Sequence, residues 1–189
     1  MNFRQFRIKL YLIACFIVIS SQATAVIIDL NTFTADPSGN VSVTADGLSA
    51  TFTEDLFISP ISLSHSGYSI PSDSTFLTFD YSLSVAAYNE DYFDFYLSDL
   101  TTPLYSVGGF SEMGDLYSGT FSHDISSYAA SSLPMIFSFS YGWEDWGFDS
   151  SLTISNLSIM QESIPVSEPG SLLLMLSGIL GIVFKFRRK

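Results

Sequence analysis

Basic side chains are almost absent from the body of this chain. The sequence has 7 Lys and Arg against 19 Asp and Glu in 189 residues, and no Lys or Arg lies between Leu10 and Phe184. All the acidic residues lie between Asp29 and Glu168. A segment of this kind has nothing to neutralise phosphate, so we exclude nucleic acid as a partner. It also lacks the Arg or Lys that recognises phosphate or carboxylate substrates.

Cysteine and histidine are also scarce. The chain has one Cys, Cys15, and two His, His65 and His123. It contains no GxSxG, HExxH or CxxC motif, which are sequence signals of serine hydrolases, zinc proteases and dithiol redox centres. Two isolated imidazoles do not supply the three or four converging ligands of a zinc site. We therefore predict that the protein is not an enzyme, with a small glycan hydrolase based on two carboxylates as the lesser alternative.

The N-terminal segment, residues 1–25, has the layout of a secretory signal peptide. Basic residues precede an apolar run from Leu10 to Ile19, and Ala23-Thr24-Ala25 follows with small side chains at the spacing that signal peptidase requires. We predict cleavage after Ala25; the alternative is an uncleaved anchor. If Cys15 leaves with this segment, the mature protein has no disulfide and depends on its core, a metal or partners for stability.

The C-terminal segment, residues 165–189, also has three parts. The pair Glu168-Pro169 precedes an apolar run from Leu172 to Phe184, and four basic residues follow close to the end of the chain. As a helix the apolar run would be ~20 Å long, short of the ~30 Å hydrocarbon core of a bilayer. The basic cluster would hold its end on the cytoplasmic side. On this pattern alone, a plain tail anchor is an alternative to a processed signal.

The C-terminal segment resembles the PEP-CTERM sorting signal of Gram-negative, biofilm-forming bacteria. The resemblance rests on Val166, Ser167, Glu168 and Pro169, the short apolar helix and the Arg-rich terminus. The chain has Ser167 where the motif has its first Pro. The resemblance implies that an exosortase in the inner membrane cuts near this motif. The protein would then be held briefly in that membrane and released to the cell surface or the extracellular matrix.

The middle segment, residues 26–164, alternates apolar and polar side chains with the period of β-strands. Leu77, Phe79, Tyr81, Leu83 and Val85 share one face of a strand. The same rhythm places Phe93, Phe95 and Leu97 on one face, and also Met135, Phe137, Phe139 and Tyr141. Asp46-Gly47 predicts a two-residue hairpin turn, a change of phase near Asn156 predicts a bulge, and only residues 124–132 suggest a helix, with Asp124 as its N-cap.

Nine or ten such strands predict an all-β fold with two packed antiparallel sheets. We predict a jelly-roll-like sandwich, with an immunoglobulin-like sandwich as the alternative, followed by the short C-terminal hydrophobic helix. The strands carry no Lys, the commonest device that protects sheet edges, so Asp, Glu, Pro or a partner must protect them.

Acidic residues that the pattern assigns to loops predict a structural calcium site. The candidate ligands are Glu90, Asp91, Glu144, Asp145 and Asp149. Calcium takes six to eight oxygen ligands, and bound cations would relieve the repulsion among the carboxylates. The alternative is a solvated acidic surface that keeps the protein soluble.

Two tryptophans, Trp143 and Trp146, flank a Glu-Asp pair in the same glycine-bounded segment. Indole rings stack on sugars and carboxylates accept hydrogen bonds from sugar hydroxyls, so this segment is a candidate polysaccharide-binding patch. The alternative is that one Trp closes the end of the sandwich and the other lies on its surface. Taken together, the sequence predicts an exported protein with a structural or adhesive role in biofilm or exopolysaccharide, and a carbohydrate-binding module is the second interpretation.

Overall fold

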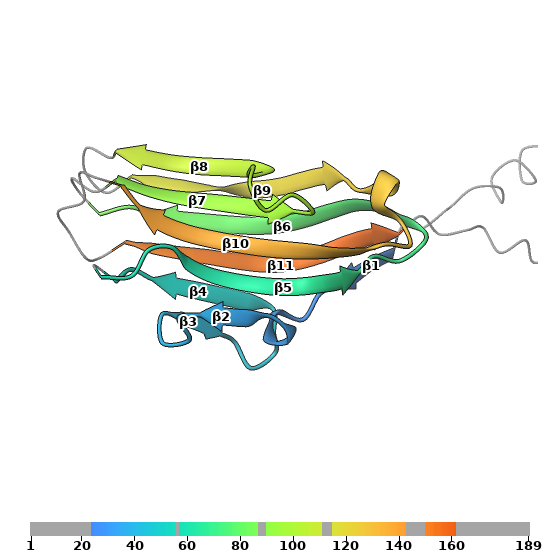
Figure 1. The fold of residues 1–189 in the computed structure, drawn as a ribbon, viewed down its shortest axis with the longest axis horizontal. Coiled ribbons are helices and arrows are strands. Elements are labelled where there is room, and N and C mark those ends of the chain that lie inside the picture. The colour runs from blue at the N-terminus through green and yellow to red at the C-terminus, as the bar shows by residue number, and fades with distance from the viewer. Residues whose placement is uncertain (1–23, 56, 87–89, 111–114, 143–149, 162–189) are drawn as a thin grey trace, which may run out of the picture. The chain divides into compact units, whose positions relative to one another are not determined.

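The structure, a computed structural model, describes residues 24–55, 57–86, 90–110, 115–142 and 150–161, all of which belong to one compact unit, Gln22–Glu162. Within these residues the chain forms eleven strands and two short 3-10 turns (Figure 1). The strands are β1 Thr24–Ile27, β2 Thr34–Asp36, β3 Val41–Val43, β4 Ser49–Thr53, β5 Ile61–Ser69, β6 Ser74–Ser84, β7 Glu90–Leu97, β8 Tyr105–Phe110, β9 Leu116–Asp124, β10 Ser132–Tyr141 and β11 Ser151–Gln161. The turns are η1 Leu30–Thr32 and η2 Ser126–Tyr128.

The strands form two antiparallel sheets. Sheet A has the order β3-β4-β11-β6-β9, with β1 beside the second half of β11, and sheet B has the order β2-β5-β10-β7-β8. From β4 onward the pairing is nested: β4 pairs with β11, β5 with β10, β6 with β9 and β7 with β8. This is the strand order of a jelly roll. The predicted jelly-roll sandwich is therefore confirmed, and the immunoglobulin-like alternative, which has a different order, is not adopted.

Alternation along the long strands decides which side chains fill the space between the sheets. In β6, Leu77, Phe79 and Leu83 are buried, while Thr78 and Ser82 lie on the outer face. Successive side chains of a strand point to opposite faces, so alternating apolar and polar residues give each sheet one face toward the core and one face toward solvent. The predicted inward set of β7, Phe93, Phe95 and Leu97, is buried as expected.

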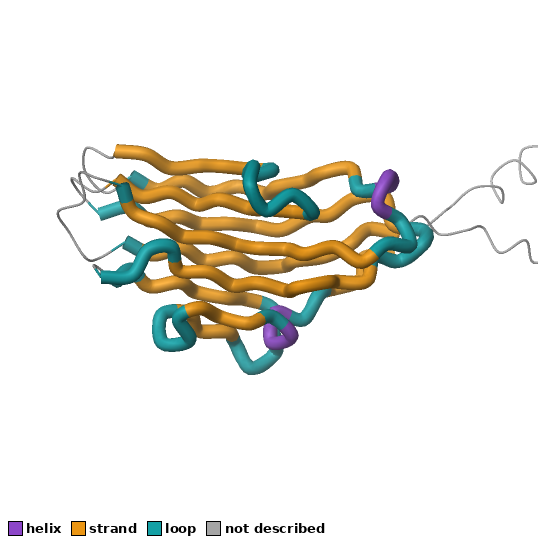
Figure 2. Tube along the Cα trace, in the orientation of Figure 1, coloured by secondary structure: helices purple, strands orange, loops and turns teal. Residues whose placement is uncertain are grey.

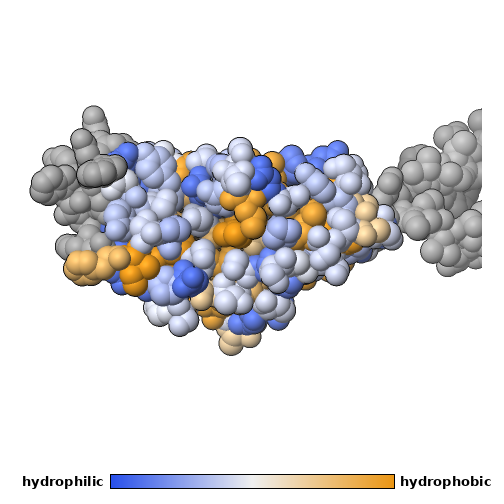
Figure 3. All heavy atoms as spheres, viewed as in Figure 1, coloured by the Kyte–Doolittle hydropathy of each residue, from blue (hydrophilic) through white to orange (hydrophobic). Residues whose placement is uncertain are grey.

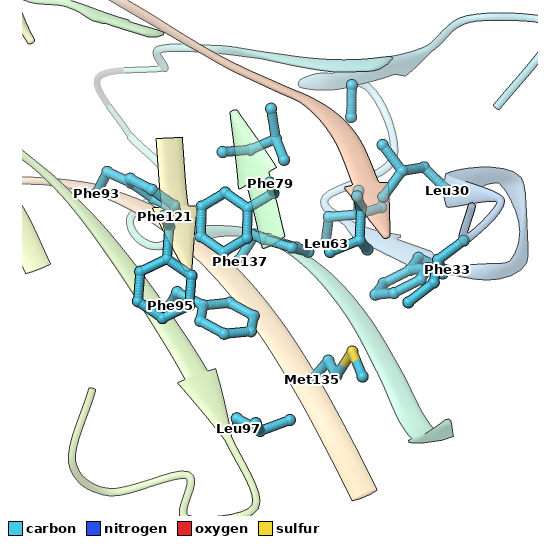
Figure 4. Packing of buried hydrophobic residues seen from close by; sticks show 14 of the residues in the cluster. Leu30, Phe33, Leu63, Phe79, Phe93, Phe95, Leu97, Phe121, Met135 and Phe137 are labelled. Carbon is cyan, nitrogen blue, oxygen red and sulfur yellow. The ribbon is translucent and has the colours of Figure 1, made fainter. Parts of the chain in front are cut away.

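Phenylalanine rings dominate one part of the core (Figure 4). The ring of Phe79 lies 4.8 Å from that of Phe121, 5.0 Å from Phe95, 5.3 Å from Phe137 and 6.0 Å from Phe93, measured between centroids. Most of these pairs are edge-on, the arrangement that the quadrupole of an aromatic ring favours. Among the residues that the structure describes, 25 buried apolar side chains form one hydrophobic core.

Two predicted local features are confirmed with more detail. The pairing between β6 and β11 shifts between Ser155 and Ser158, and Asn156 has a φ of 55°, so the predicted bulge lies there. Asparagine is one of the few residues that tolerates this left-handed conformation. The hairpin around Asp46-Gly47 also forms, but Thr44 pairs with Ser49, so its loop is longer than the predicted two residues.

The predicted helix over residues 124–132 is wrong. Asp124 is the last residue of β9, and η2 is a single turn before β10 begins at Ser132 (Figure 2). The predicted N-cap is also wrong, because the residue that caps η2 is Ile125; Asp124 instead accepts a hydrogen bond from the backbone N–H of Ser126 at 2.9 Å, which forms an Asx turn. The connection must carry the chain from sheet A to sheet B within a few residues, which leaves room for one turn only.

The two ends of the described chain are paired with each other. Thr24 of β1 lies opposite Gln161 of β11, and Ile27 opposite Ser158. The predicted signal-peptide cut after Ala25 therefore falls within β1. Ala23 and the C-terminal segment, including its predicted hydrophobic helix, lie outside the described residues. Neither helical turn in the described part of the chain is long or apolar enough to cross a membrane.

Candidate functional site

The predicted calcium ligands divide into two groups. Glu144, Asp145 and Asp149 lie outside the described residues, as do Trp143 and Trp146. Glu90 and Asp91 were assigned to a loop, and that assignment is wrong, because they are the first two residues of β7. The segment before them is short, and the alternation of β7 extends back through both. Calcium binding itself stays a prediction.

Glu90 and Asp91 point to opposite sides of sheet B. Asp91 is fully buried on the inner face, whereas Glu90 lies on the outer face and accepts a hydrogen bond from the hydroxyl of Tyr92 at 2.6 Å. Adjacent residues of a strand cannot direct both carboxylates at one ion without a bulge. Across the described ranges, no three His, Cys, Asp or Glu side chains converge in a way that could hold a metal ion.

Many of the other carboxylates cap turns. Five Asp side chains accept a hydrogen bond from the backbone N–H two residues later. These are Asp29, Asp46, Asp55, Asp99 and Asp124. A neighbouring hydroxyl and then backbone N–H groups lower the pKa of Asp46, Asp99 and Asp124. These five carboxylates, none of which was a predicted calcium ligand, therefore stabilise the backbone of turns as Asx turns.

The outer face of sheet B carries a group of residues that sequence reasoning did not select. Tyr92, Asp94 and Tyr96 alternate with the buried residues of β7 and therefore share the outer face. We call these three residues the β7 ridge. Next to it, Ser140 lies opposite Tyr92, Ser138 opposite Asp94 and Ile136 opposite Tyr96. One sequence feature could have revealed them: aromatic residues occupy the outward positions of this strand, where Ser and Thr are usual in this chain.

The paired neighbours of the two tyrosines in the β7 ridge differ, although both side chains are partly exposed. Tyr92 has Gly108 opposite on β8 and Ser140 opposite on β10, so neither neighbour covers its ring. Its hydroxyl is held by Glu90, which fixes the direction of the ring. Tyr96 lies beside Ile136, an apolar neighbour.

A row of short polar side chains crosses sheet B at the middle of the β7 ridge. From strand to strand it consists of Asp36, Ser62, Ser138, Asp94 and Ser106. Ser138 is only 7% exposed although it belongs to the outer face, so the larger side chains around it stand above it. The row therefore forms a polar floor beside the rings of the β7 ridge.

The charged side chains on this face are carboxylates, and they affect the two tyrosines. The hydrogen bond to Glu90, followed by burial, raises the pKa of Tyr92. Burial and then the carboxylate of Asp94 raise the pKa of Tyr96. Both phenols are therefore neutral donors at neutral pH.

The outer face of sheet A is different in character. One row across it reads Ser42, Thr51, Thr153, Ser82 and Ser118. Asp80 lies among these hydroxyls and accepts hydrogen bonds from Thr120 and from the side chain of Asn156, at 2.5 and 2.7 Å. Of its aromatic side chains, Phe76 is 44% exposed, near one end of the sheet. Sheet A therefore offers hydroxyl groups but no central aromatic platform.

Exposed apolar side chains gather at one end of the sandwich as well. Phe57, in the connection between β4 and β5, is 90% exposed. Asp55 holds the turn, because its carboxylate accepts from the N–H of Phe57 at 2.9 Å and its carbonyl from the N–H of Ile58. Figure 3 shows apolar atoms at this end, and further apolar atoms near the middle of the view among mostly hydrophilic ones.

The C-terminal residues indicate how the protein is sorted. Residues 165–189 match the family described as the PEP-CTERM protein-sorting motif. The chain carries a PEP-CTERM sorting motif. This confirms the resemblance seen in Val166–Pro169 and the tail, and it indicates an exported protein with a C-terminal sorting signal.

Solved structures similar to this chain include several carbohydrate-binding modules. CBM27-1 of Caldicellulosiruptor saccharolyticus, solved in complex with mannohexaose, has 10% sequence identity and a TM-score of 0.46, with 73% of this chain and 97% of that chain covered. TmCBM27, studied for specific mannan recognition, has 9% identity and a TM-score of 0.46, with 74% and 96% covered. The C-terminal CBM6 of LamC, a marine laminarinase from Zobellia galactanivorans, has 15% identity and a TM-score of 0.37, with 70% and 99% covered. At these values the similarity concerns the fold alone. No curated protein matches the chain at a significant level.

Proposed function

We propose that the sandwich is a non-catalytic polysaccharide-binding domain of an exported protein, and that this binding gives the protein an adhesive or structural role at the cell surface or in the extracellular matrix. The observation that carries the proposal is the β7 ridge: two tyrosines on the outer face of sheet B with a carboxylate between them. This joins the two functions that the sequence predicted, because a matrix protein adheres by binding the matrix polymer.

The chemistry of the ridge suits a sugar polymer. A pyranose presents a face of C–H groups that packs on an aromatic ring, and hydroxyls around its edge that need hydrogen-bond partners. Tyr92 and Tyr96 supply rings, and Asp94 supplies acceptors between them. Glu90 holds the hydroxyl of Tyr92, so less conformational entropy is lost when a ligand binds.

Carboxylate spacing on this face favours binding over hydrolysis. Glu90 and Asp94 are four residues apart on one strand, a backbone separation of about 13 Å. Asp94 and Asp36 are three strands apart, about 14 Å. Glycosidases hold their two carboxyl groups about 5–10 Å apart. The backbone separations of both pairs lie beyond that range.

The route that goes with this role follows the sorting motif. Signal peptidase removes residues 1–25, and the C-terminal segment holds the precursor in the inner membrane. An exosortase then cuts near Glu168-Pro169 and the sandwich is delivered outside. The basic tail orients the precursor with its end in the cytoplasm.

The test is retention of the protein on immobilised polysaccharide from the producing cells. Tyr92→Ala and Tyr96→Ala are each expected to abolish most retention, while Tyr92→Phe keeps the ring and most of the retention. Phe76→Ala is the matched control, because it removes an outward aromatic from sheet A instead of sheet B. Near-ultraviolet circular dichroism confirms that each variant is folded.

Variants of the predicted tryptophan patch decide between two places for the same function. If Trp143→Ala or Trp146→Ala abolishes retention and the tyrosine variants do not, the β7 ridge is the wrong site. If all four variants are retained like the unchanged protein, neither segment is the binding site. If the unchanged protein itself is not retained, the binding function is refuted.

A further inference from the structure

We infer that the β7 ridge selects uncharged polysaccharide and rejects polyuronate or sulfated chains, and that the bound chain runs along β7 from one tyrosine to the other. This inference rests on the proposed function and specifies its ligand. It follows from the charges on the outer face of sheet B and from the arrangement of the three residues.

The charge argument begins with the whole domain. No Lys or Arg occurs between Leu10 and Phe184, so the domain has no permanently cationic side chain to place beside a ligand. The face itself carries Asp94, Asp36 and Glu90. A uronate or sulfate group placed beside Asp94 meets a like charge with no compensating cation, and like charges within a few ångströms repel even near a protein surface.

The hydrogen-bond argument concerns what the face can accept. Asp94 offers carboxylate oxygens, and the serines beside it in the polar row offer hydroxyls that both donate and accept. A neutral sugar brings several O–H donors in each ring. Hydrogen bonds from these donors to a carboxylate are of the charge-assisted kind, which are stronger than those between neutral groups. An anionic sugar replaces donors by acceptors and loses these bonds.

The direction of the chain follows from the spacing of the rings. Tyr92 and Tyr96 are four residues apart on one face of β7, a distance of about 13 Å along the strand. One sugar ring cannot reach both. A linear chain laid along β7 stacks on both rings and places an intermediate unit over Asp94. A chain laid across the strands meets the polar row but only one ring at a time.

The experiment measures affinity for two polymers with the full-length chain in a detergent that has no sugar headgroup. The probes are a soluble neutral β-glucan and sodium alginate, a polyuronate, both in the presence of EDTA. We expect binding to the β-glucan and no binding to alginate. Asp94→Asn, which is nearly isosteric, is expected to weaken β-glucan binding about tenfold, because a charge-assisted hydrogen bond is lost. The same variant is expected to bring alginate binding into the measurable range.

A matched control and three outcomes make the test decisive. Asp80→Asn removes the same charge from the outer face of sheet A and is expected to change neither affinity. Opposite effects of Asp94→Asn on the two polymers support the inference. If the protein binds alginate in EDTA as tightly as β-glucan, and Tyr92→Ala abolishes alginate binding, the proposed selectivity is wrong while the proposed function stands. Binding of neither polymer, nor of the polysaccharide from the producing cells, overturns both.

Discussion

Phe79→Ala tests the packing of the sandwich most directly. Phe79 is 1% exposed and its ring contacts four other phenylalanines from both sheets. Replacing a buried phenylalanine by alanine costs about 3–5 kcal/mol, and the loss of favourable ring pairs places this site toward the upper part of that range. A domain of this size is stable by about 5–15 kcal/mol, so the variant would lose a large part of its free energy of unfolding.

The same strand supplies the control. Phe76 lies three residues earlier on the outer face of sheet A and is 44% exposed. Its replacement by alanine leaves no core cavity and is expected to cost less than about 1 kcal/mol. The two variants should therefore differ by about 3–4 kcal/mol in urea unfolding, or about 10–15 °C in Tm.

The comparison can refute the register of β6. A slip of one residue exchanges every inward side chain of a strand for an outward one. If Phe76→Ala costs as much as Phe79→Ala, or more, then the assigned faces of this strand are wrong. Urea unfolding of the segment 26–164, monitored by tryptophan fluorescence, measures both variants under the same conditions.

Four further predictions concern the bulge, acid stability, calcium and sorting. Asn156→Val should destabilise the domain by about 2 kcal/mol in urea unfolding, because a β-branched residue is strained at a φ of 55°, and Asn156→Gly should cost less than half as much. Hydrogen bonds from Thr120 and then Asn156 lower the pKa of Asp80 in the folded protein, so this carboxylate stabilises the fold above its unfolded pKa and loses that effect as pH falls through its folded pKa. The variant Asp80→Asn should therefore lose less stability than the unchanged protein below about pH 4. An equal loss of stability in both proteins at acid pH would contradict this. Calcium added after EDTA should raise Tm by several degrees more than magnesium or sodium at matched ionic strength, since saturation at about 100 times the Kd adds about 2.7 kcal/mol; equal shifts would mean charge screening and no site. Ser167→Pro, which restores the Pro-Glu-Pro motif, should speed conversion of the precursor in a pulse-chase experiment, and an unchanged rate would show that Ser167 is no impediment.

The local turns show how far sequence patterns reach. Asp46-Gly47 predicted a turn because glycine favours left-handed backbone, and the change of apolar phase near Asn156 predicted a bulge; both signals lie in consecutive residues. The helix over residues 124–132 failed for the opposite reason. Its length was limited by the distance between two sheets, which no local pattern contains.

The candidate site shows the same division. Sequence reasoning looked for function in loops, where it placed Glu90 and Asp91, and it interpreted β7 only for its buried phase. The outward phase of that strand carries Tyr92, Asp94 and Tyr96. Their importance depends on the neighbours that β8 and β10 bring alongside, and those neighbours are 12 or more residues away in the chain.

The sequence by itself determined the sorting signal of this protein, its all-β class and the side of each long strand that is buried. Those properties depend on short motifs and on a period of two residues, which are written in consecutive positions. Only the tertiary structure decided the nested pairing of β4 to β11 and the row of polar residues that crosses sheet B beside the β7 ridge. Pairing partners are chosen by how the apolar faces of all the strands bury one another, and that is a property of the whole chain.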